Sequence, residues 1–265
     1  MQASKPITKI EALKILFLCL VPVVGKGAEL ADLVPQPAWV IVPGQKFADP
    51  YRELQNYPCA SSFDAHESAH LVSSWLRWTF FKRGRAEYPF FGLQRRVVSI
   101  PCPPADVTIE SYAKYVPVRL RGSLYGTYLL SQGVQGSFFN SDILYIEEES
   151  NCYQVSASWQ AYLGDPTGIG ALGYSLEFVG YDLTLTAVLA QPKYEGRYDL
   201  RPLQTFVDWS IATRLDLVEK AKAKGRDTKD QDAWLEEFRS GPEWMHTHVR
   251  RFCDPHVSKA LLEGW

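Results

Sequence analysis

The pattern of hydrophobic and polar positions divides the sequence into regions of different character. From about residue 107 to 190, aromatic and β-branched runs such as VPVRLRG, LYGTYLL, GSFFNSDILYIEEE and YDLTLTAVL are separated by Gly, Asn, Asp and Pro. Such runs are typical of strands, and short turns between them favour antiparallel pairing. The middle of the chain therefore predicts a β-rich core built on an antiparallel sheet.

Helical signals stand on both sides of this region. A helix is predicted from about residue 62 to 81, with capping residues near its start and Gly84 after its end. From Leu203 onward, apolar residues recur at helical spacing up to Gly225, and three shorter helical segments follow, two of them beginning with Pro. The order predicts an α+β fold: an antiparallel β-rich centre, with an N-terminal helix and a C-terminal helical segment packed on the sheet.

The N-terminal residues 1–28 contain an apolar run, Ile15–Val24, preceded by three lysines. This pattern is typical of a secretory signal peptide, and the alternative is an apolar segment of the mature fold. A run of this length is too short to span a bilayer as a helix. We take residues 29–265 as a single α+β domain, secreted or exported if the run is a signal and cytoplasmic if it belongs to the fold.

Whether the cysteines form disulfides depends on whether the N-terminal apolar run is a signal peptide. Removal of a signal would leave an even number, Cys59, Cys102, Cys152 and Cys253. In an oxidising compartment these four predict two disulfides with three alternative pairings, whereas inside a cell they would be buried free thiols.

Composition and charge limit the classes of partner. The chain is 46% hydrophobic and 22% charged, which is typical of a globular protein, and its net charge of -2 provides no general attraction to nucleic acid. We therefore expect no nucleic-acid partner and no transmembrane span. A small molecule or another protein remains the expected partner.

The first helix carries the strongest chemical signal, the pattern H-E-x-x-H formed by His66, Glu67 and His70. Residues four apart share one face of a helix, so His66 and His70 can bind one zinc ion. Glu67 can act as the catalytic base that takes a proton from a metal-bound water. The segment resembles the metallopeptidase signature over about ten residues.

A catalytic zinc site needs a third protein ligand. Glu87 and Glu110 are the nearest candidates along the chain, and Glu87 is predicted as the third metal ligand. The remaining histidines, His246, His248 and His256, would be alternatives if the C-terminal segment folds onto the first helix.

Two further patterns have simpler explanations. The acidic run Glu147–Glu149 is expected to be the solvated end of a strand, although paired carboxylates can also bind a cation. The sequence GIGALG, residues 168–173, matches a dinucleotide-binding pattern by letter but is expected to be a Gly-rich hairpin loop, because a strand is predicted after it.

These features support three hypotheses about function. The most specific is a zinc-dependent hydrolase, with peptidases among the candidates. A second is a noncatalytic binding or assembly protein whose β-sheet presents aromatic residues, namely Trp75, Trp78, Tyr125, Tyr128 and Trp159. A third is a metal-free isomerase or dehydratase in which a histidine and a carboxylate transfer protons inside an apolar pocket.

Overall fold

The computed structural model describes residues 62–82, 87–91, 97–134, 137, 139–163 and 169–264. Their order along the chain is α3 (Ser62–Lys82), β1 (Glu87–Phe91), β2 (Val97–Pro101), α4 (Ile109–Ala113), η2 (Val118–Leu120), η3 (Tyr125–Leu130), η4 (Phe139–Ser141), α5 (Leu144–Leu163), α6 (Gly170–Leu189), η5 (Pro192–Tyr194), α7 (Arg201–Ala223), α8 (Lys229–Arg239), α9 (Glu243–Phe252) and α10 (Pro255–Glu263). The segment η3 is a π-helix, and the other η segments are 3₁₀ helices.

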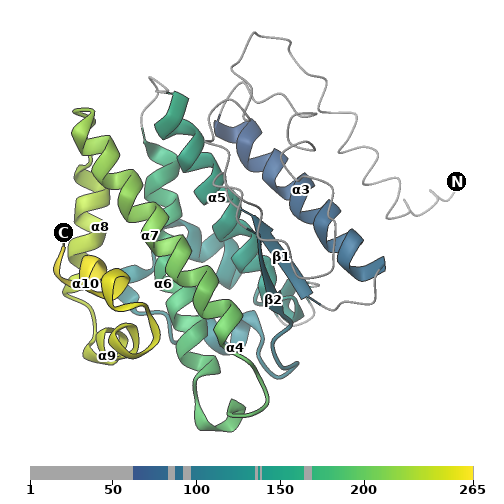
Figure 1. The fold of residues 1–265 in the computed structure, drawn as a ribbon. Helices are drawn as coiled ribbons and strands as arrows, with labels where there is room; N and C mark the ends of the chain where they lie inside the picture. The colour runs from purple at the N-terminus through teal and green to yellow at the C-terminus, as the bar shows by residue number, and fades with distance from the viewer. Residues whose placement is uncertain are drawn as a thin grey trace, which may run out of the picture.

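The helices pack side by side around α5 and α6, which we call the central helices (Figure 1). Helix α3 covers one side of α5, and α6 and α7 cover the other. Helices α8, α9 and α10, the peripheral helices, contact α6, α7 and one another. The β1–β2 hairpin packs on α3 through β1 and on α7 through β2.

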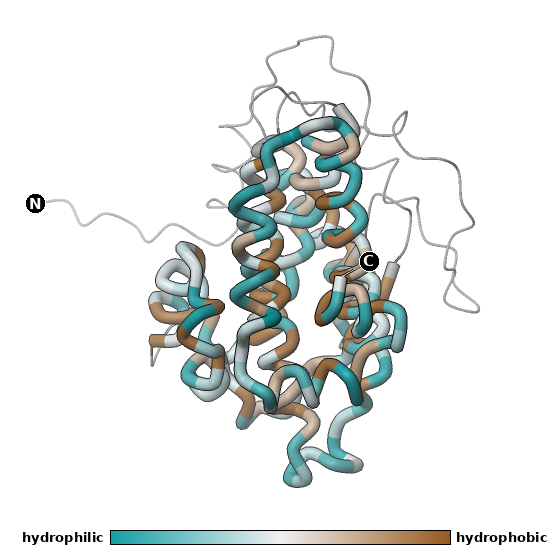
Figure 2. The backbone as a smooth tube through the Cα atoms, turned by 90° about the vertical axis from the view of Figure 1, so that its left-hand side faces the viewer, coloured by the Kyte–Doolittle hydropathy of each residue, from teal (hydrophilic) through white to brown (hydrophobic). Residues whose placement is uncertain are grey.

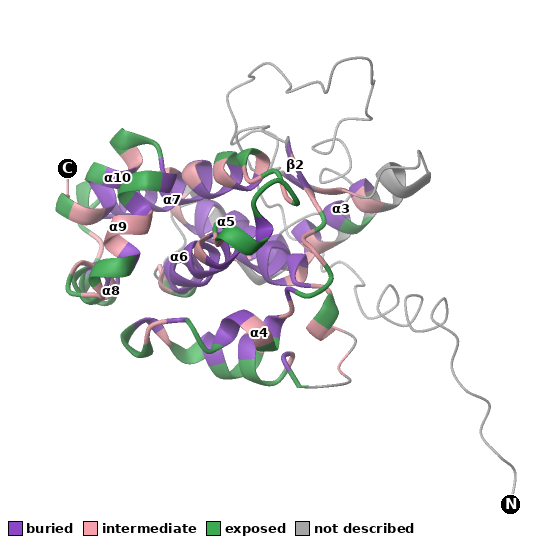
Figure 3. Cartoon of the chain, turned by 90° about the horizontal axis from the view of Figure 1, so that it is seen from below, coloured by how far each residue is buried: buried purple, intermediate pink, exposed green. Residues whose placement is uncertain are grey.

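The predicted β-rich centre, and with it the α+β class, is wrong. In the described part of the chain the only sheet is the antiparallel pair β1–β2, in which Phe90 lies opposite Val98. The region expected to form strands instead contains α4, α5 and α6. Nearly every residue of α6 is buried, and α6 is almost entirely in the buried colour of Figure 3. A helix enclosed on all sides has no polar stripe, so its aromatic and β-branched residues resemble a strand sequence.

The helices predicted at the two ends of the domain are confirmed. Helix α3 spans Ser62–Lys82, and α7 ends shortly before Gly225, whose φ of 68° suits glycine. On α8 the buried residues recur every three or four positions, and the same holds for α9. Figure 2 shows hydrophobic and hydrophilic residues interspersed along such helices. An apolar residue at every third or fourth position is the helical pattern that a sequence displays most clearly.

A buried ionic cluster joins the central helices to α7. The guanidinium of Arg214 is fully buried and donates hydrogen bonds to the hydroxyls of Ser175, Ser150 and Ser210. Its nearest carboxylate oxygen belongs to Asp182, at 3.8 Å. Burial lowers the pKa of Arg214 to about 10 and raises the pKa of Asp182 to about 6. The inward face of α7 is therefore held in place by the interactions of a buried charge as well as by apolar packing.

Several predictions concern residues outside the described ranges. These include the apolar segment of residues 1–28 and Cys59. Among the cysteines that the structure does describe, Cys102, Cys152 and Cys253 are free thiols, so no disulfide links them. None of the described helices combines the length and apolarity that a membrane span requires.

Candidate metal site

Helix α3 presents His66 and His70 to α5. The two residues are one helical turn apart, and small buried alanines, Ala65 and Ala69, precede each of them and let the two helices approach closely. Their rings meet edge to face with centroids 4.9 Å apart. The sequence prediction that both imidazoles lie on one face of a helix is confirmed.

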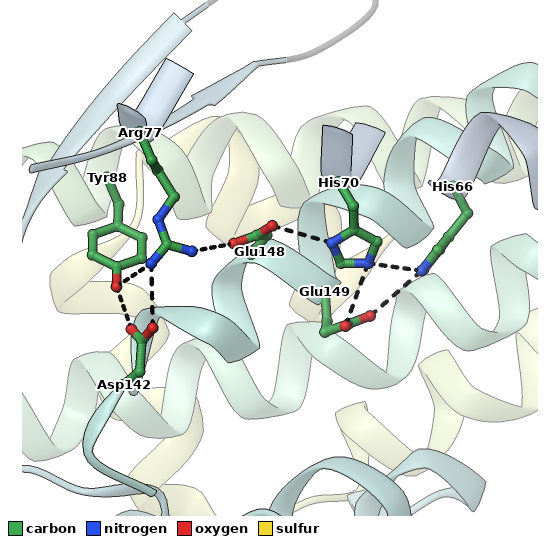
Figure 4. Close-up of polar contacts among 7 residues, drawn as sticks. All are labelled: His66, His70, Arg77, Tyr88, Asp142, Glu148 and Glu149. Carbon is green, nitrogen blue, oxygen red and sulfur yellow. Dashed lines mark hydrogen bonds and ion pairs between the residues drawn. The ribbon is translucent and has the colours of Figure 1, made fainter. Parts of the chain in front are cut away.

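The third group that meets these histidines is Glu149 of α5. The Nε2 atoms of His66 and His70 are 3.2 Å apart. The carboxylate of Glu149 places one oxygen 3.4 Å from Nε2 of His66 and its other oxygen 3.4 Å from Nε2 of His70. The three side chains can therefore hold one metal ion between them, as the close-up in Figure 4 shows.

Glu87, the predicted third ligand, does not belong to this group. It lies on β1, where its carboxylate accepts a hydrogen bond from the hydroxyl of Ser99 on β2. The other candidates also lie elsewhere: Glu110 is exposed in the first turn of α4, and His248 hydrogen-bonds Thr186 of α6. His246 bonds the carbonyl oxygen of Phe238 at 3.0 Å.

The acidic run Glu147–Glu149 lies in the first turns of α5 rather than at the end of a strand, and it is buried. On a helix, consecutive residues point in different directions. Glu148 and Glu149 accordingly face α3, while Glu147 faces the Arg214 cluster. The signal for the third ligand was present in the sequence, but it could be interpreted only once the segment was known to be helical.

Glu148 supports His70 from outside the group of three. Its Oε1 accepts a hydrogen bond from Nδ1 of His70 at 3.1 Å, and its Oε2 accepts one from Arg77 at 2.7 Å. A neutral His70 that donates from Nδ1 carries its free lone pair on Nε2, the atom that faces Glu149. Carboxylates that orient a metal-binding histidine in this way are usual partners of metal ligands.

Arg77 is itself held by two further groups. It donates to the hydroxyl of Tyr88 at 2.5 Å and to the carboxylate of Asp142 at 3.3 Å, and Tyr88 donates to the same carboxylate at 2.5 Å. The guanidinium also lies over the Tyr88 ring. The chain of contacts from His70 to Asp142 joins α3, β1 and α5 around the site (Figure 4).

The electrostatics of the group favour a bound cation. Burial alone would raise the pKa of Glu149, but the two imidazoles lower it more, to about 2. Burial would lower the pKa of His70, but Cys152, Glu148 and Glu149 together raise it well above its ordinary value. In the absence of a metal, His70 would therefore be protonated and would balance part of the negative charge around it.

Other side chains near the group were not predicted as site residues. The thiol of Cys152 lies beside His70, and burial raises its pKa to about 12. The ring of Tyr153 contacts His66 edge to face, with centroids 4.5 Å apart. Glu67, the predicted base, is half-buried and immediately follows His66.

Comparison of the chain with family models, with curated proteins and with solved structures gives no significant match. The chemistry of the site must therefore be inferred from its own geometry.

Proposed function

We propose that the protein is a zinc-dependent hydrolase whose metal ligands are His66, His70 and Glu149. The supporting observation is the spacing of the donor atoms: the two imidazole nitrogens are 3.2 Å apart, and each lies 3.4 Å from a different oxygen of the Glu149 carboxylate. A tetrahedral zinc ion with bonds of about 2.0–2.1 Å places its ligand atoms about 3.3–3.4 Å apart. The distances between neighbouring donor atoms are therefore close to those between the ligands of a zinc ion.

The charge around the site favours a divalent ion. The site contains three carboxylates, those of Asp142, Glu148 and Glu149, and one guanidinium, that of Arg77. This leaves a surplus of two negative charges when the imidazoles are neutral. Two imidazole nitrogens among three ligands favour zinc over magnesium or calcium, which prefer oxygen ligands.

Three protein ligands leave one position of a tetrahedral zinc ion open for water. The metal lowers the pKa of that water, and Glu67 accepts the proton that the water loses. The resulting hydroxide attacks an electrophilic carbonyl, and the proton on Glu67 passes to the leaving group. The H-E-x-x-H spacing makes a peptide bond the first substrate to test.

Metal analysis of protein purified in zinc-replete medium tests the first step. We expect one zinc per chain in the wild type and in Glu67→Gln, and loss of zinc in His66→Ala. Hydrolysis of a quenched fluorescent peptide library should then be present in the wild type and abolished in Glu67→Gln. A wild-type chain purified without zinc would contradict the proposal.

A structural zinc site is the second candidate, and it is favoured by one observation, the buried thiol of Cys152 beside His70. A fourth protein ligand would close the coordination shell and exclude water. Cobalt substitution separates the two proposals, because a thiolate ligand produces a near-ultraviolet charge-transfer band that Cys152→Ser would remove. An open site shows no such band, and Cys152→Ser leaves its spectrum unchanged.

A further inference from the structure

Three tyrosines lie close to the carboxylate of Glu149: Tyr128, Tyr145 and Tyr153. Two of them belong to α5 itself, and Tyr128 comes from the π-helix η3. The hydroxyls of Tyr128 and Tyr153 are 3.3 Å apart, and the Tyr153 ring touches His66. A hydroxyl from a separate element thus reaches the edge of the metal site.

The Tyr128 side chain is partly buried and tightly packed. Its ring contacts Phe178 of α6 with centroids 5.6 Å apart and also neighbours Tyr145. Its hydroxyl lies within hydrogen-bonding reach of the Glu149 carboxylate and of the Tyr153 hydroxyl. A tyrosine hydroxyl keeps its proton near neutral pH and is therefore a hydrogen-bond donor.

The backbone that carries Tyr128 is anchored by Glu177 of α6. The carboxylate of Glu177 accepts hydrogen bonds from the backbone N–H and hydroxyl of Ser123, at 3.2 and 3.0 Å, and from the N–H of Leu124 at 2.9 Å. These groups form the start of the helical segment that continues into η3. A negative charge at a helix start is stabilising, and π-helical turns often occur at functional sites.

Glycine at position 122 allows this approach. A Cβ atom at Gly122 would lie 2.2 Å from the carboxyl carbon of Glu177. The segment can therefore sit directly on the carboxylate only because position 122 has no side chain.

We propose that Tyr128 is a ligand-binding residue of the metal site, positioned by Glu177. Its hydroxyl donates a hydrogen bond to an oxygen atom of the molecule at the open metal position. In the proposed hydrolysis, that atom is the carbonyl oxygen that gains negative charge when hydroxide attacks, so the hydrogen bond strengthens in the transition state. This inference rests on the proposed function and identifies substrates by an oxygen that binds beside the metal.

The two other tyrosines suit this role less well. Tyr145 hydrogen-bonds the Glu149 carboxylate as Tyr128 does, but it lies four residues before Glu149 on the same helix and so shares the position of that ligand. Tyr153 packs its ring on His66, and its hydroxyl faces Tyr128. Only Tyr128 approaches the site from an element that carries none of the metal ligands.

Binding of acetohydroxamate to the cobalt-loaded protein tests this role without a known substrate. The probe binds metals through its oxygen atoms, and the visible spectrum of cobalt reports both metal and probe binding. We expect Tyr128→Phe to weaken acetohydroxamate binding about ten- to a hundredfold, the range for a hydrogen bond to a charged group. Probe binding is measured on each variant at cobalt saturation, so that a change in metal affinity through Glu149 is not counted as a change in probe affinity.

The matched control is Tyr174→Phe, which removes the hydroxyl of a 46% exposed residue whose ring contacts Tyr153. It should bind the probe as the wild type does. Equal probe affinity in Tyr128→Phe and the wild type would overturn the proposal. Failure of the wild type to bind cobalt would overturn the metal site as well, whereas loss of hydrolysis without loss of probe binding would concern only the proposed reaction.

A double-mutant cycle tests the positioning role of Glu177. Glu177→Gln should weaken probe binding in the wild type but cause no further loss in the Tyr128→Phe background, because Glu177 acts through Tyr128. Additive losses in the two backgrounds would assign Glu177 a general structural role. Circular dichroism of each variant checks that the helices are retained.

Discussion

The central helices and the peripheral helices bury their residues in opposite ways. Along α8 and α9 only one residue in three or four is buried, and the others are partly or fully exposed. Along α6 nearly every side chain is buried, including the acids Glu177 and Asp182. The peripheral helices are therefore held by an apolar stripe, whereas the central helices must also satisfy charged groups inside the protein.

Helix α5 shows what this difference permits. One of its faces carries Glu148 and Glu149 toward the histidines of α3, and another carries Glu147 toward Arg214 of α7. Buried charges are tolerated only when they are paired or hydrogen-bonded. A helix with two charged faces is thus stable only in the middle of a bundle that supplies partners on both sides.

The largest effect should come from removing the charge that faces the central helices. Arg214→Met leaves the buried carboxylate of Asp182 without its cation, and the free energy of unfolding should fall by about 3–5 kcal/mol. The peripheral control Arg250→Met breaks only an exposed pair with Glu243 and should change stability by less than about 0.5 kcal/mol. Urea denaturation of both variants measures the contrast; equal losses would show that position in the bundle does not matter.

A pH effect of intermediate size should arise where a peripheral helix meets a central one. Burial lowers the pKa of His248 on α9 to about 4, and its imidazole hydrogen-bonds Thr186 of α6. An unfolded histidine takes up its proton near pH 6.5, so between pH 6.5 and 4 the unfolded state binds more protons and falling pH favours unfolding.

Over that range, His248 should reduce the free energy of unfolding by about 2–3 kcal/mol. His248→Gln keeps a hydrogen-bonding group but cannot titrate, so its stability should depend less on pH than that of the wild type. Stability curves of the two proteins that remain parallel from pH 6.5 to 4 would contradict this assignment.

The two faces of α5 can be distinguished by metal affinity. Glu148→Gln weakens the support of His70 and should lower zinc affinity about 10–100-fold, the usual effect of losing an outer-layer partner. Glu147→Gln, one residue earlier, alters the face toward Arg214 and should leave zinc affinity unchanged. Competition with a chromophoric chelator measures both affinities. A similar loss of zinc affinity in both variants would show that the two faces of α5 do not act independently.

The smallest effect concerns a helix end. Gly225 follows α7 with φ at 68°, so Gly225→Ala should lower the free energy of unfolding by about 1 kcal/mol. Gly170 in the first turn of α6 has open space where a Cβ would lie, and Gly170→Ala should be neutral or stabilising. Thermal unfolding of the pair compares the two positions, and a greater loss at Gly170 would reverse the expected order.

Sequence patterns predicted the outer helices because each has one apolar face. They misassigned α5 and α6 because residues buried on all sides lose the helical period. The same error hid the third residue of the candidate metal site. Glu149 seemed to lie at a solvated strand end, and Glu87 was chosen because it is nearer to the motif along the chain. The GIGALG segment was likewise expected to be a hairpin loop, but Gly170 begins α6.

Local sequence was sufficient to specify α3 and the shared face of His66 and His70, because spacing along a helix depends only on residues one turn apart. It also specified the ends of the C-terminal helices, where Pro and Gly act on the neighbouring backbone. The meeting of these histidines with Glu149, and of Glu149 with Tyr128, depends on the packing of α3, α5 and η3. Contacts between residues so distant along the chain depend on how whole helices are buried, and a one-dimensional pattern does not contain that information.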